Sequence, residues 1–102
     1  MRCHEATTRN ACHAAKRKGR RLRARCADDG INLTHALSLE IIARAYGYAH
    51  WNDFVDRKPK RAGNDVEAHA RLRQYLEHRF GDERTPLLLD AVDGLLNPGP
   101  TA

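Results

Sequence analysis

The stretch "LTHALSLEIIARAYGYAHWNDFV", Leu33–Val55, decides the fold because it holds both the most apolar helix pattern and the clearest turn signal of the chain. Thr34 is a suitable N-cap, since its hydroxyl can accept a hydrogen bond from a free backbone N–H of the first turn. Most of the helix surface up to about Tyr46 is apolar, so we expect this helix to be the central, most buried element. Gly47 predicts the helix end, because the left-handed conformation that ends many helices suits glycine.

The segment "HWNDFVDR", His50–Arg57, predicts a short second helix after this turn. We expect Trp51, Phe54 and Val55 to face inward, with the single tryptophan anchoring the short helix on the core. Replacement of a core tryptophan by alanine costs about 3–5 kcal/mol. The glycine and the tryptophan therefore indicate a structural corner more than a reactive site.

The N-terminal segment, about Thr8 to Asp29, contains no proline and predicts a long helix that ends near Gly30. Mostly small residues recur along it at spacings of three and four, which places them on one helix face: Cys12, Ala15, Gly19, Leu22 and Cys26. Because only Leu22 among them is large, another helix can approach this face closely.

Two further helices follow the break "KPKRAGN" at residues 58–64. Asn64 or Asp65 can cap a helix that runs to about Phe80, and Thr85 with Pro86 forms a start signal for the last one. The apolar positions of these helices are Val66, Leu72, Tyr75, Leu76, Phe80, Leu87, Leu88, Ala91, Val92, Leu95 and Leu96.

No segment shows the alternating pattern of a strand, so the sequence predicts an all-α protein of four main helices and one short helix after Gly47. We expect one domain over residues 1–102. Its parts are a basic helix (1–30), a helix-turn-helix-like core motif (31–58), a linker (59–64) and a C-terminal helical hairpin (65–97).

The positive charge is concentrated in the first quarter of the chain. Residues 1–27 hold nine basic residues against one acidic residue, whereas the rest of the chain is slightly acidic. The dense part contains Lys16, Arg17, Lys18, Arg20, Arg21, Arg23 and Arg25. This density indicates a polyanionic partner, with contacts to nucleic-acid phosphates through these seven side chains. The alternative is that the arginines only keep the helix solvated.

The cysteine count and the lack of long apolar stretches indicate where in the cell we expect the protein. An odd number of cysteines, Cys3, Cys12 and Cys26, argues against a disulfide framework and favours a reducing cytoplasm. No stretch approaches the roughly 18 apolar residues of a membrane span, and the N-terminus lacks the apolar part of a signal peptide. We therefore expect a cytoplasmic protein that does not contact membranes.

The core motif resembles a helical module found alone or at the N-terminus of bacterial glyoxalase-superfamily proteins, with the pattern I-S-H-S-x-A-L-E-x-I-A-x-x-x-G-Y-x-D-W-N-x-L. The matching residues are Thr34, His35, Leu39, Glu40, Ile42, Ala43, Gly47, Tyr48, Trp51 and Asn52. With the preceding basic helix, the similarity covers about residues 15–55. It implies a helical fold and no assigned activity, since glyoxalase chemistry belongs to a separate domain that we do not expect within these residues.

This chain departs from the pattern at Ala36, Ser38 and His50. His50 stands where the pattern has an aspartate before the tryptophan, and that aspartate would be the natural cap of the short helix. The sequence therefore does not show which group caps the short helix.

Ala43 and Gly47 also fit a DNA-reading helix-turn-helix, in which Asn52 would meet base edges. A plain helical corner is the favoured alternative, because Trp51 and Asp53 suit a phosphate-lined groove poorly. A structural role is likewise favoured for His35, since no nucleophile or carboxylate pair lies at a useful spacing.

We expect no enzyme activity, cofactor or metal. No phosphate-binding glycine loop or HExxH motif occurs, and adjacent Cys12 and His13 point too far apart on a helix to share a zinc ion.

The sequence thus predicts a small non-catalytic accessory protein, bacterial or from a mobile element, that acts as a regulator and binds nucleic acid through its basic helix. The alternative is a protein-interaction module, adaptor or antitoxin-like, whose basic helix meets an acidic protein surface or whose leucine-rich last helix binds a partner. An uncovered strip on that last helix would also support a homodimer. Otherwise its leucines pack on Ile41, Ile42 and Trp51.

Overall fold

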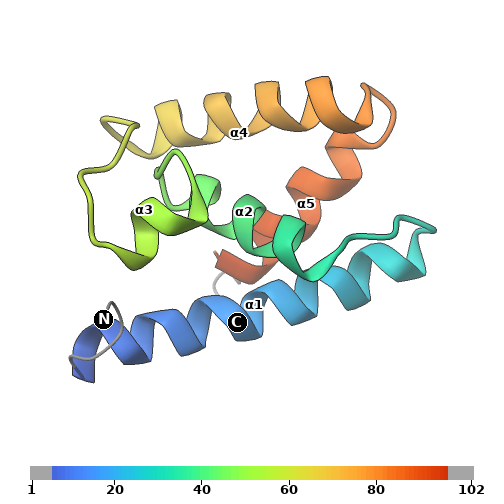
Figure 1. Ribbon diagram of the computed structural model, residues 1–102. Helices are drawn as coiled ribbons and strands as arrows, with labels where there is room; N and C mark the ends of the chain where they lie inside the picture. The colour runs from blue at the N-terminus through green and yellow to red at the C-terminus, as the bar shows by residue number, and fades with distance from the viewer. Residues whose placement is uncertain (1–5, 97–102) are drawn as a thin grey trace, which may run out of the picture.

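The computed structural model describes residues 6–96, which form helices and, within that range, no strand (Figure 1). The five helices are α1 (Ala6–Asp28), α2 (His35–Ala45), α3 (Trp51–Val55), α4 (Asp65–Phe80) and α5 (Thr85–Leu96). Figure 1 shows α1 along one side of the molecule and α4 along the opposite side, with α2 between them. The all-α prediction is confirmed. The predictions for Cys3 and for the end of the chain lie outside the described residues.

The small-residue face of α1 packs against α2, as the spacing predicts. Every residue of that face, from Cys12 to Cys26, is buried, and Leu22 is 0% exposed. A Cβ added to Gly19 would lie 3.3 Å from Leu39 Cδ2 and 3.3 Å from Ser38 Oγ. The absence of a side chain at Gly19 therefore lets the two helices approach closely, and Leu22 supplies the bulk beside this contact.

Helix α2 begins and ends at the predicted residues. Thr34 Oγ1 accepts a 3.1 Å hydrogen bond from the Leu37 N–H, and Gly47 follows the helix with a φ of 102°. The carbonyl of Gly47 also accepts hydrogen bonds from the N–H groups of Arg61 (2.8 Å) and Ala62 (3.0 Å). The glycine therefore ends α2 and also fastens the 59–64 linker to the turn.

Trp51 and Phe54 of α3 pack against the core, as expected from the sequence, but neither is fully buried. Trp51, Phe54 and Val55 are only half-buried, and α3 contains no buried residue. The Phe54 ring instead lies at the centre of an aromatic cluster, with ring centroids 5.4 Å from Tyr46, 5.4 Å from Tyr48 and 5.2 Å from Trp51. Because Trp51 keeps part of its surface in water, we expect its replacement by alanine to cost less than the roughly 3–5 kcal/mol of a fully buried aromatic residue.

Helix α4 is capped by Asn64, whose Oδ1 accepts a 2.8 Å hydrogen bond from the Glu67 N–H. Leu72 and Leu76 are buried, but Val66 is 80% exposed, so its assignment to the apolar face is wrong. Val66 lies in the first turn of α4, on the side that faces solvent.

Helix α5 supplies the other wall of the core. Thr85 is buried as its first residue and donates a 2.8 Å hydrogen bond to the Gly81 carbonyl, in place of the predicted capping role. The apolar residues buried on this helix are Leu88, Leu89, Ala91 and Val92. Leu87 is 46% exposed. Most of the leucine-rich strip therefore belongs to the core of this chain.

Two further findings concern the cysteines and the membrane. Cys12 is disulfide-bonded, which corrects the expectation from the odd cysteine count, whereas Cys26 is a free and buried thiol. Burial raises the pKa of Cys26, with Asp29 adding to the effect. None of the helices within residues 6–96 combines the length and apolar character that crossing a membrane requires.

Candidate functional site

Four basic side chains form one surface on the solvent side of α1. Successive residues of an α-helix differ in direction by about 100°, so Lys16, Arg17, Arg20 and Arg21 fall within an arc of roughly 140°. The centre of this arc is turned about 150° away from the buried small-residue face. All four side chains are exposed. We call them the outer basic patch.

The other three predicted basic residues are held by contacts within the molecule. Lys18 Nζ donates a 3.2 Å hydrogen bond to Tyr46 Oη, which joins α1 to the end of α2. Arg23 Nε donates to the Leu33 carbonyl at 3.2 Å, next to the start of α2. These two side chains lie on either side of the buried face. Their hydrogen bonds join α1 to the two ends of the α2 segment.

Arg25 pairs with α5. Its terminal nitrogen lies 3.3 Å from Asp90 Oδ2, and both side chains are largely exposed. An exposed pair of this kind contributes little stability, but it lowers the free charge that Arg25 can offer to a partner. The structure thus divides the seven predicted residues into an outer set of four and a flanking set of three.

The outer basic patch is not neutralised inside the described part of the chain. None of its four side chains forms an ion pair with an acidic residue within residues 6–96. Lys16 with Arg20, and Arg17 with Arg21, are like charges at positions i and i+4, which repel one another. An anion placed over all four side chains would relieve this repulsion.

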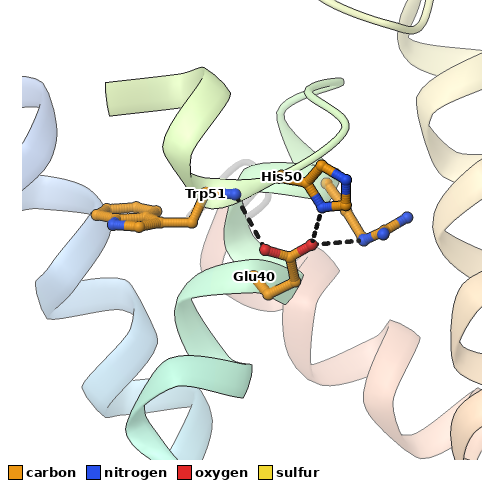
Figure 2. A network of polar contacts seen from close by, with 4 residues as sticks. Glu40, His50 and Trp51 are labelled. Atoms are coloured by element: carbon orange, nitrogen blue, oxygen red, sulfur yellow. Dashed lines mark hydrogen bonds and ion pairs between the residues drawn. The ribbon is translucent and has the colours of Figure 1, made fainter. Parts of the chain in front are cut away.

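A second polar cluster holds the α2–α3 corner together (Figure 2). The Glu40 carboxylate, on α2, accepts a 3.0 Å hydrogen bond from the backbone N–H of Trp51, the first residue of α3. Its other oxygen lies 2.8 Å from His50 Nδ1 and 3.2 Å from Arg44 Nε. Figure 2 shows the Trp51 indole extending away from this carboxylate while its backbone nitrogen points toward it.

Glu40, a residue of α2, therefore acts as the N-terminal cap of α3 by accepting the hydrogen bond from the Trp51 N–H. His50 occupies the N-cap position but its side chain makes no capping hydrogen bond. Because α3 lacks a local acceptor for its first N–H, a carboxylate one helix away satisfies that group. The resemblance pattern includes Glu40, but sequence spacing alone did not indicate that it would reach Trp51.

The hydrogen bonds also set the ionisation of Glu40. Partial burial acts to raise its pKa, but the hydrogen bonds from the Trp51 N–H and from His50, with the nearby Arg44 charge, outweigh burial. The pKa of Glu40 consequently lies below its ordinary value. The carboxylate is ionised at neutral pH, in the form that accepts from all three neighbours.

The remaining motif residues have structural positions. His35 is exposed as the first residue of α2, and its carbonyl accepts a 2.7 Å hydrogen bond from Ser38 Oγ. Asn52 is exposed on α3, which spans only five residues. A recognition helix places several side chains along a groove. The shortness of α3, with Asp53 and Asp56 on it or beside it, favours the helical corner.

The described residues contain no group of three or more His, Cys, Asp or Glu side chains arranged to hold a metal ion. His13, next to Cys12 in the sequence, is exposed.

A family model described as glyoxalase superfamily protein matches residues 5–84, which include α1 to α4. The chain belongs to this family. Neither a curated protein nor a solved structure matches the chain. The match confirms the relation to glyoxalase-superfamily proteins that the motif residues imply.

Proposed function

We propose that this member of the family binds nucleic acid without catalysing a reaction, through phosphates that contact the outer basic patch. The observation that carries the proposal is the division of charge on α1. The flanking basic residues have partners within the molecule, whereas Lys16, Arg17, Arg20 and Arg21 face solvent together and lack an acidic partner among the described residues.

The same helix supplies the rigidity that a binding surface needs. The face opposite the patch is buried against α2 and the rest of the core, with Ala15 and Leu22 both 0% exposed. The backbone that carries the four charges is therefore held in place before binding, which lowers the entropy cost of ordering the interface.

Phosphate contact is the mode that fits this surface. Lysine and arginine side chains on a helix exterior can neutralise backbone phosphates, whereas sequence reading needs side chains inserted at base edges. The α3 corner is too short to add such a reading element. We infer a sequence-tolerant interaction, consistent with a regulatory accessory protein.

We assign the Leu33–Val55 motif a scaffolding part in this function. Thr34 and Gly47 set the two ends of α2, and the Lys18–Tyr46 hydrogen bond joins α2 to the basic helix. The motif thereby fixes α1 in the orientation that exposes the patch.

The test is fluorescence anisotropy with labelled duplex and single-stranded oligonucleotides over a range of salt concentrations. Four phosphate contacts predict that the logarithm of the binding constant for duplex falls with log salt with a slope of about −3.6. We expect the quadruple variant K16Q/R17Q/R20Q/R21Q to abolish binding, because it removes every charge of the patch.

A charge-matched control separates the patch from bulk positive charge. The variant K58Q/R73Q/R79Q/R84Q removes the same number of exposed basic residues from other parts of the chain. It should keep most of the affinity. If both variants lose affinity equally, or if the wild-type protein binds neither oligonucleotide at low salt, the proposal is wrong. The second result would favour the other partner that the basic helix suits, an acidic protein surface.

A further inference from the structure

A cleft of about 390 Å³ lies on the other side of α2, between the turn at Gly47, the 59–64 linker and α4. Its polar lining consists of Arg44, His50, Arg61, Arg71, Gln74 and His78, and no acidic residue lines it. In Figure 1, α4 and the turn lie across the molecule from α1. The cleft is therefore separate from the outer basic patch.

Two carboxylates pair with Arg44 and Arg71 of the cleft and leave most of the donors of these two arginines available. Glu40 accepts from Arg44 Nε at 3.2 Å, and Glu67 accepts from Arg71 Nε at 2.8 Å. A guanidinium carries five N–H donors, of which Nε supplies one. Each of these two arginines thus retains its terminal N–H groups for a further acceptor.

The cleft also retains positive charge after these pairings. Its three arginines, Arg44, Arg61 and Arg71, stand against the two carboxylates Glu40 and Glu67. Arg61 forms no ion pair with any residue in the range 6–96. One net positive charge therefore remains, before any contribution from the histidines.

Contacts around the cleft hold its walls in place. The Arg44 guanidinium lies 3.9 Å from the centre of the Tyr75 ring, and this cation–π contact helps to hold the guanidinium in place. The backbone N–H groups of Arg61 and Ala62 are both bonded to the Gly47 carbonyl. The Arg44 guanidinium and the backbone of Arg61 are thus held in place without a ligand.

We propose that this cleft binds a small organic phosphate ester. Guanidinium groups match phosphate oxygens with paired N–H donors, and a phosphate monoester carries nearly two negative charges at neutral pH. The volume falls within the range of sites for small organic ligands. Tyr48 and the small side chains of Ala62 and Ala68 provide less polar walls for the organic part.

The test uses adenosine monophosphate as the probe, with adenosine and inorganic phosphate as comparisons, in a titration of ¹⁵N-labelled protein followed by NMR. We expect saturable shifts of the Gly47, Arg61 and Ala62 amides with adenosine monophosphate at millimolar concentration. Adenosine should cause no such shifts, and inorganic phosphate should bind more weakly.

Variants then locate the site. Arg61 and Arg71 are exposed, so R61Q and R71Q should fold normally, which a melting curve checks. Each should weaken binding about tenfold, the loss expected for one charge-assisted hydrogen bond. The control R73Q, also on α4 but not in the cleft, should leave the affinity unchanged.

Three results would overturn this inference: no saturable shifts, equal affinity for inorganic phosphate and the ester, or equal loss in R61Q, R71Q and R73Q. The quadruple α1 variant should bind the ester like the wild type. A loss of ester binding in that variant would place the ligand on α1 and contradict the cleft assignment, independently of the oligonucleotide result.

Discussion

The contact between α1 and α2 and the corner between α2 and α3 hold the same central helix in two different ways. On the α1 side, small and apolar side chains are completely buried, and Gly19 allows the backbones to approach. On the α3 side, half-buried aromatic rings are combined with a carboxylate that bridges two helices. The α1–α2 contact is therefore shielded from water, whereas the α2–α3 corner is partly exposed to it.

This difference predicts how each contact responds to mutation and pH. A dry contact depends on volume and is insensitive to ionisation, because nothing in it titrates near neutral pH. A half-exposed polar corner tolerates the loss of volume better, but it depends on the charge of Glu40. The following substitutions test this contrast, in order of decreasing effect.

The largest effect is expected for Leu22→Ala in the α1–α2 contact. Leu22 is fully buried, so the variant should lower the free energy of unfolding by about 3 kcal/mol through lost burial and a cavity. Urea denaturation followed by circular dichroism measures this change. Leu87→Ala is the matched control, because Leu87 is 46% exposed and should lose less than about 1 kcal/mol. Equal losses in the two variants would contradict the packing that we describe.

An intermediate effect is expected for Trp51→Ala at the α2–α3 corner. Because Trp51 is half-buried, we expect a loss of about 2 kcal/mol, below the range for a fully buried aromatic residue. Trp51→Phe should recover most of this stability by keeping the ring contact with Phe54. A loss for Trp51→Ala as large as that for Leu22→Ala would show that the corner is part of the dry core.

The smallest effect at neutral pH is expected for Glu40→Gln. Glutamine can still accept from the Trp51 N–H but lacks the charge that attracts His50 and Arg44, so we expect a loss of about 1 kcal/mol. Thermal melts at pH 7 measure this change. Glu77→Gln, which alters an exposed residue of α4, is the control with little expected effect.

The pH dependence of Glu40→Gln has a defined sign. The fold lowers the pKa of Glu40 from its ordinary value, so the unfolded chain binds this proton more readily than the folded protein. The stabilising contribution is complete above about pH 5 and is lost as the pH falls through the lowered pKa. Wild type and variant should therefore converge in stability at low pH. A difference that stays constant from neutral to acidic pH would exclude this role for the ionised carboxylate.

Much of the helical framework could be predicted from local signals. The spacing from Cys12 to Cys26 defined the buried face of α1, and Thr34, Gly47 and Asn64 marked helix ends through their own hydrogen-bonding or backbone preferences. Such signals act within one or two helical turns, so they need no knowledge of the rest of the chain.

The failures share a different cause. Val66 and Thr85 were assigned from patterns that do not show which side of a helix meets a neighbour, and the burial of Trp51 was overestimated because residue type alone does not show how much covers a side chain. The disulfide at Cys12 was likewise not anticipated from the count of cysteines.

For the candidate interface, the sequence identified the basic segment. It did not show which of the seven basic residues face solvent and which contact other parts of the molecule. The separation depends on distant partners: Tyr46 for Lys18, Leu33 for Arg23 and Asp90 for Arg25. Once these pairs are formed, the four remaining side chains define the outward face.

The sequence by itself determined the all-helical class, the buried stripe of α1 and the ends of α2, because helix periodicity and capping are properties of neighbouring residues. Only the tertiary structure decided that Glu40 caps α3, that Gly47 holds the linker and that the arginines around it share a cleft. These contacts join residues separated by roughly ten to thirty positions along the chain, and no local pattern encodes which distant group will satisfy a given donor.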